Sequence, residues 1–194
     1  MYRSDDLSVF LLVAVMLAAP LAAKDEKEDA RGFKEFSERM NRYVSLHKTV
    51  EGTLPSLKQT DVPELITAHQ QALARKIREA RPQAKRGDIF TSEASEAFRH
   101  AVAKQWDGAH GRHARATISQ GEPLRTRDLP VNDVYPEKLP YTTVPPTMLS
   151  VLPKLPQEMA YRIVGRSILL IDVRANLIVD LIREAMPKTF VPTP

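Results

Sequence analysis

The chain has 194 residues and a formal net charge of +4, with 43% hydrophobic and 27% charged residues. These proportions are those of a folded globular protein of about one domain, and they argue against intrinsic disorder. Cysteine is absent, which excludes disulfides, a thiolate nucleophile and a cysteine-based metal site, and the modest positive charge gives no support to nucleic-acid binding.

The N-terminus has the pattern of a secretory signal peptide. Residues 9–19 form an unbroken apolar run, and Leu21-Ala22-Ala23 places small residues before the charges that begin at Lys24. The run has the length of a signal-peptide hydrophobic region, whereas a transmembrane helix needs about 20 residues. We therefore expect residues 1–23 to be removed on export to the periplasm or medium, which leaves no stable membrane span. Retention of this segment as a membrane anchor is the alternative.

Two amphipathic helices are expected after the signal. The first follows a charge-dense stretch, residues 24–38, that we expect to be frayed, and it carries an apolar stripe over 33–50 that includes His47. We interpret His47 as a histidine at the edge of the core, bonded to a backbone group, and a functional role is the alternative. The second helix begins near Asp61, which can act as its N-cap, and Gly87 stops it.

The exposed side of the second helix is rich in cations. Such a side is usually a solvated face, because cations near a helix C-terminus interact favourably with the helix dipole. The alternative is a face that binds an anionic partner. Its candidate residues are Arg75, Lys76, Arg78, Lys85 and Arg86.

A third helix is expected after Thr91 or Ser92, either of which can act as its N-cap, and it carries Phe98 and Trp106 on its apolar side. Residues 123–156 then contain eight of the 15 prolines, which disfavours regular helix. The same segment is rich in Leu, Val and Tyr. We therefore predict an extended strap that lies over the helices, with one helical turn near Met148.

Residues 161–182 predict a three-stranded antiparallel meander. Three runs rich in Val, Ile and Leu are separated by turns, in which Gly165 and Asn176 suit a positive φ. The middle run is apolar on both faces, so we expect a central strand that is covered on both sides. The predicted fold is therefore α+β, with residues 24–160 as helices and strap, and residues 161–194 as a meander that packs on the same core of one domain, 24–194.

Four stretches together resemble a group of short exported bacterial proteins of unknown function. They are Gly87-Asp88-Ile89-Phe90-Thr91, residues 114–121, Tyr135-Pro136-Glu137 and residues 155–162. This resemblance covers nearly the whole mature chain and implies no activity or catalytic residue. The pattern of residues 161–180 also looks like the small C-terminal β unit of some periplasmic proteins, including ones linked to nickel and cobalt balance.

Specific chemistry finds little support in the sequence. His110 and His113 are spaced to share one ion, but a metal site normally has three or four protein ligands, so we predict no metal and no cofactor. No nucleophile motif lies in a suitable context, and the glycines do not form a phosphate-binding loop. Asp172 and Asp180 interrupt apolar strands; we expect them to cap or terminate strands, or to pair with Arg162 or Arg166, rather than to act as an acid–base pair.

The sequence therefore favours a non-catalytic binding or accessory module that meets an unknown protein or an anionic component of the cell envelope. The alternative is a hydrolase-type enzyme whose site is assembled from dispersed residues. Its candidates are His47, His69, Asp88 and His113. A pocket lined by these residues would favour the enzyme, whereas a convex basic face would favour the binding module.

Overall fold

The structure is a computed structural model that describes residues 6–57, 61–107 and 129–187, with side chains described from Lys24 onward. Three helices come first, α1 (Asp6–Glu51), α2 (Pro63–Ala80) and α3 (Ser92–Asp107). The short strand β1 (Thr142–Thr143) and the helical turn α5 (Pro146–Leu149) precede the strands β2 (Met159–Val164), β3 (Ser167–Asp172) and β4 (Leu177–Ile182). The fold is α+β, as predicted.

The strands form one antiparallel sheet in the order β1-β2-β3-β4. Strands β2 to β4 are the predicted meander, and both predicted turn residues take a positive φ, 55° at Gly165 and 50° at Asn176. The sheet has four strands and not three, because the strap supplies β1 at the free edge of β2. All six residues of β3 are buried, so the central strand is covered on both faces as expected.

Part of the strap lies on the outer face and edge of the sheet, whereas the sequence predicted that it would lie over the helices; the part around α5, with Val144, Met148 and Leu152, does pack in the core that the helices form. The strap first runs beside β4, where Asn132 N donates to Ile178 O at 2.7 Å, and its later residues pair with β2 as β1. Its apolar side chains, among them Tyr135 and Leu139, pack on Leu169 and its neighbours in a second, smaller core. The reason is that the meander has two apolar faces and the helices can cover only one.

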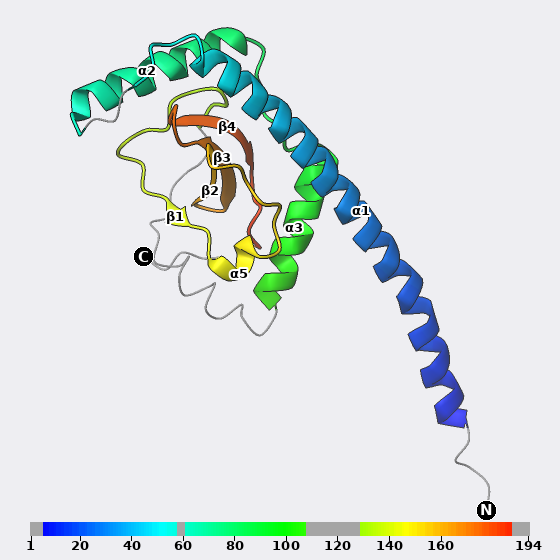
Figure 1. Cartoon of the computed structure of the whole chain (residues 1–194). Helices are drawn as coiled ribbons and strands as arrows, with labels where there is room; N and C mark the ends of the chain where they lie inside the picture. The colour runs from blue at the N-terminus through cyan, green and yellow to red at the C-terminus, as the bar shows by residue number, and fades with distance from the viewer. Residues whose placement is uncertain (1–5, 58–60, 108–128, 188–194) are drawn as a thin grey trace, which may run out of the picture.

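The main core lies between the helices and the other face of the sheet. Figure 1 shows the C-terminal part of α1 lying against α2 and α3, while its N-terminal part extends away from the sheet. Phe36, Phe90, Phe98 and Tyr161 form a cluster of stacked and edge-to-face rings at the centre. Gly32 lets α1 approach α3, because a Cβ atom there would lie 2.5 Å from the Glu93 carbonyl oxygen.

Three boundaries of the helices differ from the sequence prediction. Residues 24–38 are helical and not frayed; the spacing of four in the Lys24–Glu28 and Lys34–Glu38 ion pairs supports this part of α1. The N-cap of α2 is Val62 and not Asp61, with Pro63 in the first turn. The helix ends at Ala80, well before Gly87, because Pro82 disfavours helical geometry in the residue before it.

Candidate functional site

The five predicted cations of the second helix are all exposed. Arg78 Nη1 lies 3.7 Å from Asp133 Oδ1, with both side chains about half exposed. The charged groups of the other four, Arg75, Lys76, Lys85 and Arg86, have no hydrogen-bond or ion-pair partner among the residues that the structure describes. The predicted basic face is therefore present on α2 and in the loop after it, and most of its charge is unpaired.

The three described candidates of the alternative enzyme, His47, His69 and Asp88, do not form a joint site. His47 is fully buried in α1, His69 is partly buried in α2, and Asp88 lies in the loop before α3 with Arg81 3.8 Å away. Within the described chain, these three residues make no hydrogen bond or ion pair with one another. His110 and His113 lie outside the described residues.

His47 instead belongs to a buried cluster that joins α1 to the end of β3. Its Nδ1 lies 2.6 Å from Asp172 Oδ2, and the Tyr43 hydroxyl donates to the same oxygen at 2.7 Å. The other carboxylate oxygen of Asp172 accepts the backbone N–H groups of Arg174 and Ala175, at 3.0 and 2.9 Å. An ionised carboxylate that accepts all four bonds requires the hydrogen of the His47 ring on Nδ1.

Charged groups surround the other side of the imidazole. Glu51 Oε2 lies 3.4 Å from His47 Nε2, and Arg174 Nη1 pairs with Glu51 Oε1 at 2.6 Å. Glu158, which is 3% exposed, pairs with Lys48 at 3.5 Å. Burial lowers the pKa of His47, but the hydrogen bond and charge of Asp172 and the charges of Glu51 and Glu158 outweigh it, so the pKa is raised.

An Asp–His pair of this kind can orient a catalytic base, but here it fits a structural role. In a catalytic triad the free ring nitrogen faces a nucleophile, whereas His47 Nε2 faces the Glu51 carboxylate. No described hydroxyl forms a hydrogen bond with Nε2, and the His47 side chain is 0% exposed. The cluster fixes the α1 helix against the β3–β4 turn, so the expected backbone partner of His47 is wrong and a carboxylate takes its place.

Asp180 has a comparable structural role in β4. Its carboxylate accepts the backbone N–H groups of Gly87, Ile89 and Phe90, at 3.0, 2.8 and 2.8 Å. Burial raises its pKa, although these bonds act in the opposite direction. The predicted role at a strand end is confirmed for Asp172, which ends β3, but not for Asp180, which lies inside β4 and binds the loop before α3. Neither aspartate pairs with Arg162 or Arg166, because Arg166 donates to the Met186 carbonyl and Arg162 stacks on tyrosine rings.

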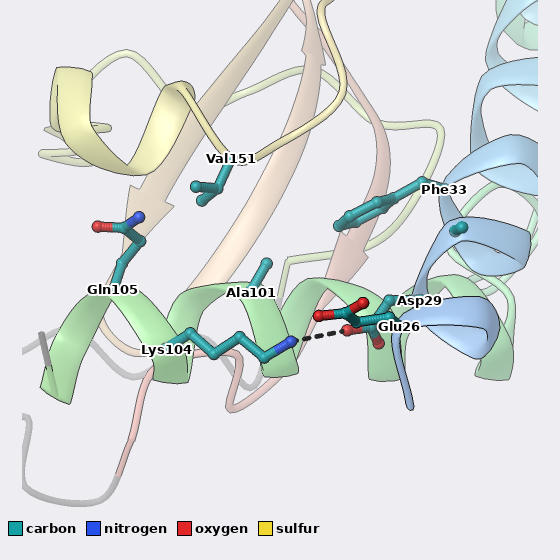
Figure 2. Close-up of a pocket in the computed structure, with 8 residues that line it drawn as sticks. Glu26, Asp29, Phe33, Ala101, Lys104, Gln105 and Val151 are labelled. Carbon is teal, nitrogen blue, oxygen red and sulfur yellow. Dashed lines mark ion pairs between the residues drawn. The ribbon is translucent and has the colours of Figure 1, made fainter. Parts of the chain in front are cut away.

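A surface pocket of about 360 Å³ lies between α1 and α3. Figure 2 shows Phe33, Ala101 and Val151 around its apolar part, with Lys104 directed towards Asp29. Asp29 is engaged by Lys104 at 3.5 Å and by His100 at 2.9 Å. None of the three described candidates, His47, His69 and Asp88, lines this pocket, so it gives the enzyme hypothesis no support.

Metal binding and membrane crossing can be assessed for the described residues only. Among them, no group of three or more His, Asp or Glu side chains is placed to hold a metal ion. No helix in the described ranges combines the length and the apolar character that a membrane crossing requires. Neither finding extends to the side chains of residues 1–23 or to residues 108–128.

The buried cluster was the feature that sequence reasoning missed. One signal was available, because Tyr43, His47 and Glu51 follow one another at a spacing of four on the apolar side of α1. Polar groups on a buried face need partners, and Asp172 was the polar residue at the end of the central strand. The pairing of residues 125 positions apart could not be read from either pattern alone.

Comparison with known proteins adds no assignment. The chain matches no protein-family model, no curated protein and no solved structure.

Proposed function

We propose that the chain is an exported, non-catalytic binding module that attaches to an anionic membrane surface of the cell envelope through α2. The observation that carries this proposal is the combination, at one end of the molecule, of exposed large apolar side chains with five exposed cations, of which only Arg78 has an ion-pair partner among the described residues. We call this the α2 surface. It consists of Leu57, Val62, Leu65, Ile66, Arg75, Lys76, Arg78, Lys85 and Arg86.

The apolar part of this surface lies at the beginning of α2. Leu65 and Ile66 are 52% and 45% exposed, and Val62 and Leu57 are 46% and 41% exposed. The buried residues of the helix begin only at Leu73. Figure 1 shows α2 lying across the C-terminal end of α1, with its N-terminal end at the edge of the molecule. The apolar side chains of α2 therefore extend into its first turns, beyond the part of the helix that packs in the core.

Three of the cations, Arg75, Lys76 and Arg78, lie on the same helix, and Lys85 and Arg86 lie in the loop after it. Lys76 follows Leu65 by 11 residues, about three helical turns, so the two side chains lie on one side of α2. Helices that combine exposed apolar side chains with Lys and Arg bind at lipid interfaces, where the apolar groups enter the acyl boundary and the cations meet anionic headgroups. Each Lys or Arg near such a surface contributes about 1 kcal/mol. An acidic protein would satisfy the cations but would not by itself account for the exposed Leu65 and Ile66.

Vesicle binding tests the proposal. The chain beginning at Lys24 should sediment with vesicles of phosphatidylcholine that contain about one third phosphatidylglycerol, and should not sediment with pure phosphatidylcholine vesicles. The triple change Arg75→Glu, Lys76→Glu and Arg86→Glu should weaken binding at least tenfold, because three attractive charges become repulsive. Binding should also decrease as salt is raised.

A matched control makes the same change in net charge at another part of the protein surface. Arg31, Arg42 and Lys154 are exposed and have no ion-pair partner among the described residues, and changing all three to Glu should leave vesicle binding within about threefold of the parent. Equal loss in both triple variants would mean that only net charge matters and would remove α2 from the proposal. No binding to anionic vesicles would point to a protein partner instead.

Export is the other half of the proposal. It is supported by the apolar run at residues 9–19, and the buried side chains described in α1 begin at Asp29, within the part of α1 described from Lys24 onward. Removing residues 1–23 would therefore leave the described core intact. The mass of the protein recovered from the periplasm should be lower than that of the full chain by about 23 residues. A full-length species confined to the membrane fraction would show a retained anchor.

A further inference from the structure

Arg162 is held in an unusual setting on the sheet face that the strap covers. Its guanidinium carbon lies 4.1 Å from the centre of the Tyr141 ring and 5.1 Å from that of the Tyr135 ring. The two rings meet edge to face, with centres 6.0 Å apart. Tyr135 is 3% exposed and belongs to the second core, whereas Tyr141 is 49% exposed. The guanidinium is therefore placed between a buried ring and one at the surface.

The hydrogen-bonding groups of Arg162 are unused within the described chain. The Arg162 side chain makes no hydrogen bond or ion pair with any described residue, and within the described chain its guanidinium contacts only the two rings. Stacking uses the flat face of a guanidinium and leaves the N–H groups at its edge available. A partly buried Arg without an anion is uncommon, because Arg is a strong donor that normally meets a carboxylate or phosphate.

Two further donors lie close to this edge. Thr143 in β1 is directly opposite Arg162 in β2, so the two side chains lie on the same face of the sheet. The Tyr141 hydroxyl, on an exposed side chain, has no described partner, whereas the Tyr135 hydroxyl already donates to Leu139 O at 3.1 Å. Burial raises the pKa of Tyr135 to about 12, so that ring stays neutral beside the cation.

We propose that Arg162, with Tyr141 and Thr143, forms a binding site for a carboxylate group. The parallel N–H groups of a guanidinium match the two oxygens of a planar carboxylate. One guanidinium carries one positive charge, which balances a carboxylate but leaves a phosphate dianion half neutralised. The stacked rings hold the guanidinium in place before binding, which reduces the entropy lost when the ligand arrives. The site is separate from the α2 surface and does not depend on the function proposed for it.

Nuclear magnetic resonance of the arginine side chains tests this site directly. Titration of the chain beginning at Lys24 with sodium propionate should move the Nε–H resonance of Arg162 saturably, with a Kd in the millimolar range expected of a single charge-assisted contact. The Arg166 resonance is an internal control, because its guanidinium already donates to Met186 O at 3.2 and 2.7 Å. Sodium phosphate at the same ionic strength should bind more weakly.

Variants separate this role from simple packing. Arg162→Lys keeps the charge but removes the parallel donors, and it should weaken propionate binding at least tenfold, measured from the backbone resonance of Thr143. Tyr141→Leu should weaken it roughly threefold by removing one stacking ring. A short peptide ending in Glu, compared with propionate, distinguishes a carboxylate on a chain from a free one. Absence of any saturable shift, or an equal shift at Arg166, would show that the stacking serves only the fold.

Discussion

A chain shortened to residues 24–160 should not fold. The deletion removes β3, β4 and the last four of the six residues of β2, and with them the sheet face that covers Phe36, Leu73 and the rest of the helical core. Twelve Val, Ile and Leu residues lie in 161–182, and the helices alone cannot replace the surface that they bury. Circular dichroism should show little cooperative thermal transition. A monomeric, helical fragment that melts near the temperature of the parent would show that the meander is an appendage.

A point mutation tests the same architecture without removing whole strands. Leu169 is 0% exposed in the central strand, so Leu169→Ala should lower the free energy of unfolding by about 2–5 kcal/mol. Leu149 is a matched control, since its side chain is 44% exposed, and Leu149→Ala should stay within about 0.5 kcal/mol. Similar losses in the two variants would contradict the assignment of Leu169 to a core between sheet and strap.

Asp172→Ala should be almost as damaging as the loss of a large core side chain. The change leaves the Tyr43 hydroxyl, the His47 ring and two backbone N–H groups without the acceptor that they share. Breaking a buried charged pair in this way costs about 3–5 kcal/mol. In a domain of this size each kcal/mol shifts the Tm by about 2–4 °C, so thermal melts should show a fall of roughly 6–20 °C.

The control for this change is Asp133→Ala. Asp133 also pairs with a cation, but its side chain is 47% exposed, and surface ion pairs contribute about 1 kcal/mol or less. The pH dependence provides a second readout. Because the pKa of His47 is raised above its ordinary value of 6.5, the folded state binds a proton more tightly than the unfolded state does. The resulting stability is fully present below pH 6.5 and is lost as pH rises through the folded pKa.

His47→Gln should therefore flatten the decline in Tm between neutral and weakly alkaline pH. The titratable and charged groups around the His47 ring are Tyr43, Asp172, Glu51, Glu158, Lys48 and Arg174. The pKa of Tyr43 is raised by burial and by the charge of Asp172, so its phenol does not contribute a change in this range. An unchanged pH profile in His47→Gln would assign the decline to other groups.

Local patterns were sufficient to predict the class of fold. Strands β2 to β4 follow from runs of Val, Ile and Leu between residues that accept a positive φ, and α3 follows from its apolar spacing and from Thr91, whose hydroxyl accepts the Ala94 N–H at 3.3 Å. The five cations of the second helix were also identified correctly as exposed. These features depend on the secondary-structure preferences of residues that are close together along the chain, and such preferences can be read from the sequence directly.

Only the tertiary structure decided which surfaces and polar groups meet. The sequence showed that the meander has two apolar faces, but not that the strap covers one of them and adds β1 to its edge. It showed His47, Asp172 and Arg162 as isolated residues, whereas their partners lie on distant elements: Asp172 for His47, and Tyr135 and Tyr141 for Arg162. The physical reason is that hydrogen bonds and ring contacts depend on distances of a few ångströms between side chains, and chain folding sets these distances independently of separation along the sequence.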